Sequence, residues 1–123
     1  MTESYLTRVA PYIIHSADGG LVEEYFGSNT PEDKSISIAH IVVPPGWNEP
    51  SQCPEFDEYT IMVRGAKMVE LEDEKIIVGA GESILVYKGT KVHYSNPFDQ
   101  EAEYWAICKP AFSPETAHRD DAA

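Results

Sequence analysis

Short segments that alternate between apolar and polar residues run along most of the chain, separated by Gly, Pro, Asn and Asp. Residues 35–43 begin with strict alternation, are rich in Ile and Val, and end at Pro44-Pro45-Gly46. Further segments rich in β-branched and aromatic residues lie at 58–64, 66–71, 75–78, 83–87, 92–95 and 103–108. Seven short strands at this spacing predict an all-β sandwich or barrel.

Helical periodicity is almost absent, and one helix start is predicted near the C-terminus. There Ser113 is a suitable N-cap, Pro114 suits the first helical position, and Glu115 favours the positive end of the helix dipole. A length of 123 residues is typical of one domain. We expect an N-terminal arm or short extra strands over residues 1–34, a barrel over 35–112 and a C-terminal tail over 113–123.

The chain is strongly acidic, with 9 Lys and Arg against 21 Asp and Glu and a net charge of −12. This balance argues against binding to nucleic acid and to anionic membranes, both of which require cationic side chains. No apolar run approaches the ~20 residues that span a bilayer, and no basic stretch followed by an apolar run begins the chain. The prediction is therefore a cytoplasmic protein, in which Cys53 and Cys108 are most simply free thiols.

Two segments bounded by glycines carry the most specific pattern. The first runs from Gly46 through Glu58 to Gly65, and the second from Gly81 through Gly89 to Asn96. Their spacing resembles the two motifs of the cupin superfamily, small double-stranded β-helix barrels of the jelly-roll type. The resemblance covers about residues 36–110 and implies that fold. The first motif and the tail are similar to those of small cupins of the ethanolamine-utilisation type.

In many cupins three His and one Glu hold a divalent transition metal. The resemblance implies which positions of this sequence correspond to those four ligands. Only the Glu is present, as Glu58. The His positions fall on Gln52 and Pro54, or with a longer spacer on Ser51 and Cys53, and on Val92 in the second motif. The motifs are thus degenerate, and we expect no well-formed metal site.

His93 lies one residue from the expected second-motif His, and one residue along a strand means the opposite face. Only a bulge would turn it inward. The fallback is a weak divalent transition-metal site formed by Gln52, Glu58 and His93.

Glu58 is the candidate catalytic residue. The family position implies that it points into the barrel, together with Thr60 and Met62. A carboxyl group in such apolar surroundings has a raised pKa and suits general acid or base chemistry. The candidate ligand-binding residues are Gln52, Glu55, Met62, Val92, Tyr94 and His40.

Several of these residues also have simpler interpretations. Glu49 and Asp57 are expected in a solvated loop at the barrel mouth, because charged residues are seldom buried. His40 is expected to share a face with Ile38 and Val42, either as a core histidine or as a pocket base.

Three functions remain open at this point. The first is small-molecule binding inside the barrel, with Glu58 as acid or base and Gln52 and Tyr94 orienting the substrate. The second is a non-catalytic metabolite-binding or sensory module. The third is an acetate- or phosphate-handling activity like that of the ethanolamine-utilisation cupin, to which the shortage of cations is an objection, since Arg64 is the only arginine in the motif region.

The expected partners are a small-molecule ligand and a second copy of the chain. Small cupins commonly pair through strands. The aromatic residues Tyr5, Tyr12, Tyr25 and Phe26 of the N-terminal arm offer apolar surface for a homodimer.

Overall fold

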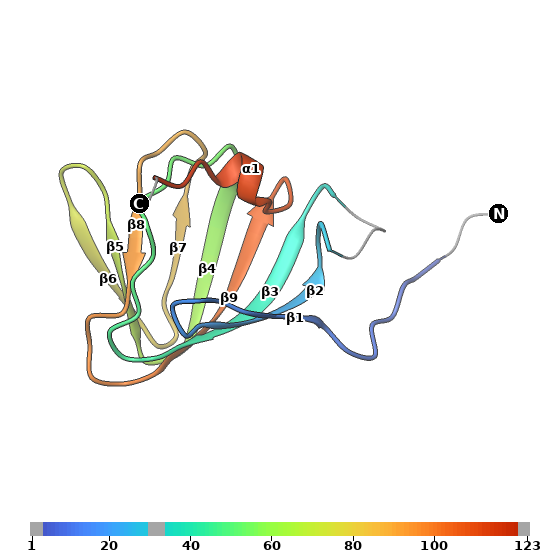
Figure 1. Ribbon diagram of the computed structural model, residues 1–123, viewed down its shortest axis with the longest axis horizontal. Helices are drawn as coiled ribbons and strands as arrows, with labels where there is room; N and C mark the ends of the chain where they lie inside the picture. Colours follow the sequence, from blue (N-terminus) through green and yellow to red (C-terminus); the bar gives the residue numbers. More distant parts are fainter. Residues whose placement is uncertain (1–3, 30–33, 121–123) are drawn as a thin grey trace.

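The computed structural model describes residues 4–29 and 34–120, which form two antiparallel sheets and one short helix (Figure 1). The strands are β1 (Tyr12–His15), β2 (Leu21–Phe26), β3 (Ser37–Val43), β4 (Asp57–Arg64), β5 (Ala66–Glu70), β6 (Lys75–Gly79), β7 (Ser83–Val86), β8 (His93–Ser95) and β9 (Ala102–Lys109). The helix is α1 (Pro114–Ala117). The strands from β3 onward coincide with the seven predicted segments to within a few residues.

The larger sheet has the order β1-β2-β3-β9-β4-β7, and the smaller sheet has the order β6-β5-β8. The two sheets lie opposite each other and enclose the core, as Figure 1 shows. Neighbouring strands in both sheets are antiparallel. β3 and β9, which lie far apart in the sequence, pair directly with each other. The predicted all-β, jelly-roll fold is confirmed.

Alternation along the central strands decides which residues reach the interior. On β4, Thr60 and Met62 are buried while Ile61 and Val63 are exposed. On β9 every second residue from Ala102 onward is buried. Side chains on alternate positions point to opposite faces of a sheet, so the inner faces of β4 and β9 form the wall of the barrel.

The turn between β4 and β5 depends on Gly65. Its φ is +75°, and an added Cβ would lie 2.5 Å from the backbone oxygen of Glu101. Both the left-handed conformation and the close approach exclude a side chain here. Gly65 thereby allows the chain to pass directly from the large sheet to the small one.

The N-terminal region supplies two strands, β1 and β2, that extend the larger sheet beyond β3. The sequence left open whether this region was an arm or extra strands, and the structure shows both: residues 4–11 run away from the barrel (Figure 1). The parts of the predicted arm at residues 1–3 and 30–33 lie outside the described residues.

The C-terminal segment begins with the predicted helix start. Ser113 caps α1, and its side chain accepts a hydrogen bond from the Thr116 backbone N–H at 3.2 Å. The chain then runs beside residues 51–55, where Glu55 N–H donates to the Thr116 carbonyl at 2.9 Å and Asp120 N–H donates to the Ser51 carbonyl at 2.7 Å. These bonds fix the segment over one end of the barrel (Figure 1).

Within residues 4–29 and 34–120, no helix has the length and apolar character needed to cross a membrane.

Candidate functional site

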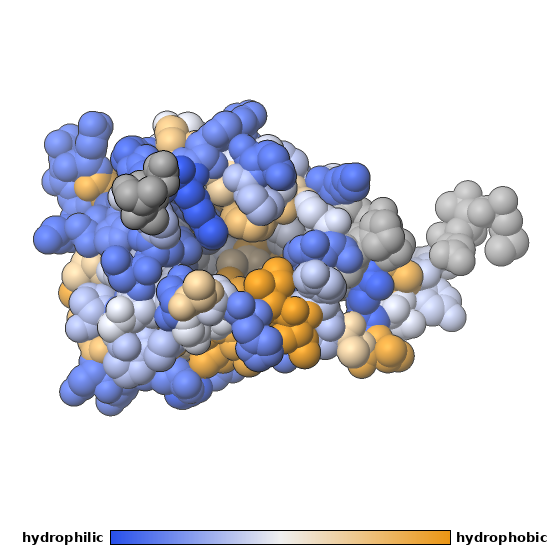
Figure 2. Space-filling model, in the orientation of Figure 1, coloured by the Kyte–Doolittle hydropathy of each residue, from blue (hydrophilic) through white to orange (hydrophobic). Residues whose placement is uncertain are grey.

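A cavity of about 630 Å³ opens into the barrel between the β1–β2 hairpin and the C-terminal segment. Its apolar wall comes from the inner face of the larger sheet and from the loop after β3, through Ala39, Ile41, Val43, Trp47 and Ala106. The exposed Asp18, Glu115 and Arg119 mark the side where it meets solvent. Figure 2 shows the hollow near the centre of this face, with apolar surface beside it and hydrophilic surface around most of its rim. A volume of this size suits a small organic ligand.

Glu58 lies on the cavity wall near the start of β4, opposite Cys108 on β9 and Val86 on β7. Its surface is only half-buried because the cavity reaches it, yet protein surrounds the carboxyl group. Burial raises the pKa of Glu58, and the charges of Lys67 and Arg119 and a hydrogen bond with the Cys108 thiol oppose this only in part. Glu58 therefore takes the position that the sequence predicts.

Glu49 also lines the cavity, so its expected place in a solvated loop is wrong. The side chain is 14% exposed, and Arg119 Nη2 approaches its Oε2 at 3.5 Å. Burial, together with repulsion from Glu58 and Asp18, raises the pKa of Glu49 to about 7 despite attraction to Arg119 and Lys67. The cavity thus holds a second carboxyl group with a raised pKa.

Gln52 also lines the cavity and is almost fully buried, at 2% exposed. Its backbone pairs with Val92 through two hydrogen bonds of 2.9 Å, which fix it against the small sheet side of the barrel. Its Oε1 accepts from Arg119 Nε at 3.4 Å. The structure therefore brings Gln52, Glu49 and Arg119 together on one wall of the cavity.

Lys67 extends from β5 across the interior and is 1% exposed. Its Nζ donates to Thr60 Oγ1 on β4 at 3.5 Å and lies 4.1 Å from the ring centroids of Tyr94 and Tyr104. Burial lowers the pKa of Lys67, and attraction to Glu58 and Glu49 offsets this only partly. Lys67 and Tyr104 both form part of the cavity wall.

Three of the predicted ligand contacts are core residues. Met62, Val92 and Tyr94 are 1–2% exposed and pack in the main hydrophobic cluster, not on the cavity wall. Val92 and Tyr94 point inward as the alternation predicts. Tyr94 reaches the site indirectly, because its ring packs against the Lys67 ammonium group.

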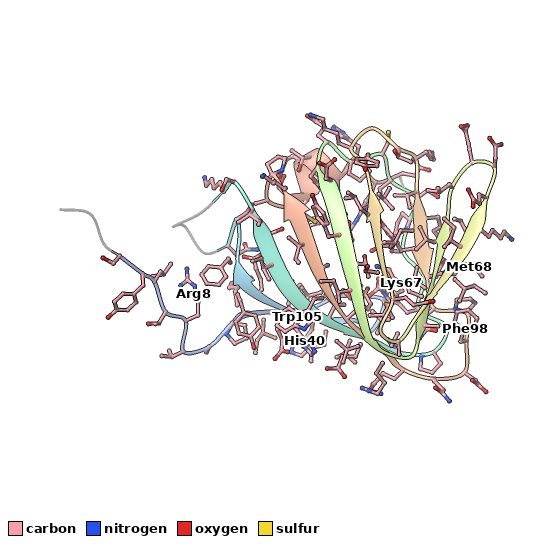
Figure 3. All side chains as sticks on the ribbon, turned by 180° about the vertical axis from the view of Figure 1, so that it is seen from behind. Arg8, His40, Lys67, Met68, Phe98 and Trp105 are labelled. Atoms are coloured by element: carbon pink, nitrogen blue, oxygen red, sulfur yellow. The ribbon has the colours of Figure 1, made fainter. Side chains whose placement is uncertain are left out.

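His40 shares a face of β3 with Ile38 and Val42, as expected, but this face is the outer one. The residues of β3 that line the cavity are Ser37, Ala39, Ile41 and Val43, so His40 lies on the outer face. Its Nδ1 is 2.9 Å from Glu23 Oε1 and its Nε2 is 2.7 Å from Glu103 Oε2. Its ring packs against Trp105 at 5.0 Å, and Figure 3 shows the two side chains together. It is neither a pocket base nor a core histidine.

Glu55 and His93 also lie away from the cavity. Glu55 is exposed and pairs with His118 Nε2. His93 is directed to the outside of β8, where Nδ1 lies 3.3 Å from Glu70 Oε1 and Nε2 bonds to Asn48. The fallback metal set of Gln52, Glu58 and His93 is therefore wrong, because the register of β8 directs His93 away from the other two.

The sequence interpretation missed Lys67 and Arg119. Lys67 shares a face with the buried Val69, so the alternation of residues 66–71 contained a signal for its burial that was not used. Arg119 gave no such signal, since its place at the cavity depends on the backbone pairing of the C-terminal segment with residues 51–55.

Comparison with protein families shows to which family the chain belongs. The model of the cupin domain family matches residues 39–108, more than half of the chain. The chain belongs to the cupin domain family. The resemblance drawn from the glycine motifs is thereby confirmed, and the protein is a small cupin.

Solved cupin structures share this architecture at low sequence identity. A Streptomyces PAC13 variant with uridine has a TM-score of 0.74 and 19% identity, covering 98% of this chain and 92% of that one. An RmlC-like cupin from Shewanella frigidimarina has a TM-score of 0.71 and 14% identity, covering 89% and 93%. The putative ethanolamine utilization protein Q of Salmonella typhimurium has a TM-score of 0.60 and 16% identity, covering 76% and 72%. These likenesses show the fold.

One curated relative is similar in sequence. It is the endoribonuclease YbeY of Myxococcus xanthus, 41% identical over 108 residues. The match covers 88% of this chain but only 37% of the length of that protein.

The metal site of metal-binding cupins does not fit the residues of this cupin. At the positions of the three His stand Gln52 and Pro54, or with the longer spacer Ser51 and Cys53, together with Val92, and none of these residues offers an imidazole. Among residues 4–29 and 34–120, no three His, Cys, Asp or Glu side chains group closely enough to hold a metal ion. Glu58, at the position of the metal-binding Glu, instead shares the interior with the buried cation of Lys67.

Proposed function

We propose that this cupin binds a small organic molecule in the barrel cavity and uses Glu58 as a general acid or base. The observation that carries the proposal is a carboxyl group with a raised pKa on the wall of a 630 Å³ cavity. Because its pKa is raised, such a group holds its proton to a higher pH than an ordinary carboxyl group does, which suits acid or base chemistry. A perturbed titratable group in a pocket with an apolar wall is typical of active sites.

The second carboxyl group gives the site two protonation steps. Glu49, with a pKa of about 7, lies within the electrostatic reach of Glu58. Two carboxyl groups in different surroundings commonly divide the roles of acid and base. We assign proton transfer at the ligand to Glu58 and proton storage near the mouth to Glu49, with the Gln52 amide orienting the ligand.

The comparisons support the binding part of this proposal. The structure of Streptomyces PAC13 was determined with uridine, so a barrel of this fold is known together with a small molecule. The cavity does not favour RNA, the substrate class that the name of the Myxococcus xanthus relative suggests. The cavity wall carries two cations, Lys67 and Arg119, against the five carboxyl groups of Asp18, Glu24, Glu49, Glu58 and Glu115. This excess of acidic groups opposes a polyanionic substrate.

The alternative is a non-catalytic metabolite-binding or sensory cupin. The apolar wall formed by Ile41, Val43 and Trp47 favours this reading, because it provides affinity without requiring a reaction. An acetate- or phosphate-handling activity is less well supported. Arg64, the arginine of the motif region, lies outside the cavity and pairs with Glu101 and Glu103.

A fluorescence screen tests binding directly. Trp47 lines the cavity, whereas Trp105 lies on the outer face, so a Trp105→Phe variant reports on the cavity alone. We expect neutral or cationic metabolites to change its emission with saturation. If a broad panel of such compounds leaves the emission unchanged, the binding proposal fails.

Substitution at Glu58 then separates enzyme from binding module. Glu58→Gln keeps the shape of the side chain and removes its ability to donate or accept a proton. The matched control is Glu55→Gln, on the exposed neighbouring loop. If ligands of the cavity are converted, we expect conversion to be lost in Glu58→Gln and retained in Glu55→Gln. Tight binding without conversion in the wild type would favour the sensory module.

We also infer that the protein forms a homodimer through its N-terminal region. Tyr5 is 78% exposed and Tyr12 is 48% exposed, and both offer apolar surface to a second copy. Light scattering on the protein in solution should give twice the chain mass, and the chain mass itself would contradict the inference.

A further inference from the structure

Lys67 is the one buried cation inside the barrel among the described residues, and its surroundings are unusual for a lysine. Figure 3 shows it between the two sheets. Its contacts are the neutral hydroxyl of Thr60 and the faces of two phenol rings, those of Tyr94 and Tyr104. Lysine is seldom fully buried unless a carboxylate pairs with it.

No described carboxylate forms a contact ion pair with Lys67. The charges of Glu58 and Glu49 act on it from further away, and they offset the effect of burial only in part, so its pKa is lowered. A larger fraction of its side chain is therefore the neutral amine than in an exposed lysine. Desolvation of this kind is one of the ways in which proteins make a lysine nucleophilic.

Lys67 also forms part of the cavity wall, together with Glu58 and Glu49. Two proton-exchanging carboxyl groups and an amine in one cavity are the groups that imine formation requires. We propose that Lys67 is a nucleophile that forms a Schiff base with a small aldehyde or ketone bound in the cavity. This inference rests on the proposed binding of a small molecule there.

The reaction conserves atoms and charge without a further reagent. The lone pair of Lys67 Nζ attacks the carbonyl carbon, the C=O π pair moves to oxygen, and a proton transfers from nitrogen to oxygen to give a carbinolamine. Protonated Glu58 or Glu49 then donates a proton to the hydroxyl, the C–O bond breaks, and water leaves. The nitrogen lone pair forms the C=N bond, which leaves an iminium cation and a carboxylate.

The rings of Tyr94 and Tyr104 favour the product of this sequence. Each ring face lies 4.1 Å from Nζ and attracts positive charge at that place. The protonated Schiff base carries a positive charge, whereas the free amine does not. The arrangement therefore stabilises the adduct relative to the neutral amine from which it forms.

Reductive labelling of the wild-type protein tests the proposal. The native protein is treated with acetaldehyde and cyanoborohydride at neutral pH, which converts each iminium to a stable N-ethyl group, and labelled lysines are located by peptide mass spectrometry. The internal controls are the exposed lysines Lys34, Lys75, Lys88, Lys91 and Lys109. Each unit by which the pKa of Lys67 lies below theirs increases its amine fraction about tenfold.

We expect Lys67 to be labelled faster than any exposed lysine in the native protein, and at an equal rate in denaturant. In Lys67→Met the fast phase should disappear, while Lys75→Met should retain it. Labelling of the exposed lysines with Lys67 unmodified, or modified more slowly than they are, would overturn the proposal.

The outcome is separate from that of the proposed function. If Lys67 stays unmodified while the cavity binds ligands and Glu58→Gln removes their conversion, only the Schiff-base inference fails. If Lys67 is labelled fast but Glu58→Gln has no effect on any conversion, the acid–base proposal fails and the nucleophile stands.

Discussion

The two faces of the larger sheet hold their charges in opposite ways. On the outer face, His40 lies between Glu23 and Glu103 at 2.9 and 2.7 Å, and Arg64 Nε contacts Glu103 at 3.2 Å. On the inner face and around the cavity, Glu58 has no contact ion pair among the described residues, and Glu49 has one at 3.5 Å.

The protonation states differ accordingly. Outside, hydrogen bonds with His40 and Arg64 lower the pKa of Glu103, and although burial alone would lower the pKa of His40, its bonds to Glu103 and Glu23 raise it. Inside, burial raises the pKa of Glu58 and Glu49 and lowers that of Lys67. Close pairing fixes the charged forms, whereas burial without close pairing favours the neutral forms. Groups that readily exchange protons therefore gather inside the barrel.

The largest expected effect comes from removing the inner carboxyl group. Glu58→Gln should lower the rate of any conversion in the cavity by about 100-fold or more, the usual contribution of a general acid or base. Glu103→Gln, on the outer face, should leave that rate within about twofold. Steady-state kinetics would measure both variants. Equal losses of rate in Glu58→Gln and Glu103→Gln would contradict the proposed difference between the inner and outer faces.

A core substitution on β4 should have the next largest effect. Met62 is 2% exposed and lies in the main hydrophobic cluster, so Met62→Ala should lower the free energy of unfolding by about 2–5 kcal/mol. Val63 on the opposite face is 48% exposed, and Val63→Ala should change it by less than about 1 kcal/mol. Urea unfolding measures both. If Met62→Ala weakened ligand binding without lowering stability, Met62 would be a ligand contact and not a core residue.

The raised pKa of Glu49 predicts a dependence of stability on pH. Between its ordinary value of 4.5 and about 7, the native state keeps a proton that the unfolded chain has released. Stability therefore falls as the pH rises through this window and is constant for this group above it. Glu49→Gln removes this loss of stability at high pH. The free energy of unfolding of the variant should therefore exceed that of the wild type by about 1–3 kcal/mol at pH 8.

Thermal or urea unfolding at pH 5 and pH 8 would measure this difference. An equal effect of Glu49→Gln at both pH values would show that the group is not protonated in the native state near neutral pH.

The smallest effect is expected at the outer cluster. The raised pKa of His40 means that its contribution to stability is complete below about pH 6.5 and is lost as the pH rises through the raised value. His40→Gln should cost about 1 kcal/mol at pH 6 and little at alkaline pH, with no effect on ligand binding. A cost that grows with pH, measured by urea unfolding, would refute the assignment of a charged His40.

The fold was largely predictable because its determinants are local. Alternation located the strands, glycines such as Gly65 marked the turns, and the family spacing placed Glu58 on the inner wall. His40 was misplaced because both faces of β3 carry apolar residues, so alternation did not distinguish the face towards the cavity.

The rest of the site depends on contacts between distant segments. Arg119 reaches the cavity only because residues near the C-terminus pair with Ser51 and its neighbours. Glu49 was assigned to solvent because loops rich in charge usually lie there. Alternation along β5 predicts that the Lys67 side chain points inward. It does not predict that the ammonium group is fully buried, because that depends on Thr60, Tyr94 and Tyr104 from three other strands.

The central claim is that Glu58 and Glu49 in the cavity are shifted towards their neutral forms, whereas Glu103 on the outer face is shifted towards its charged form. A ¹³C NMR titration of the glutamate side-chain carboxyl groups measures this directly. The account predicts a midpoint of about 7 for Glu49, a midpoint above 4.5 for Glu58 and one below 4.5 for Glu103. Midpoints for Glu49 and Glu58 at the ordinary value, equal to those of exposed glutamates, would contradict it.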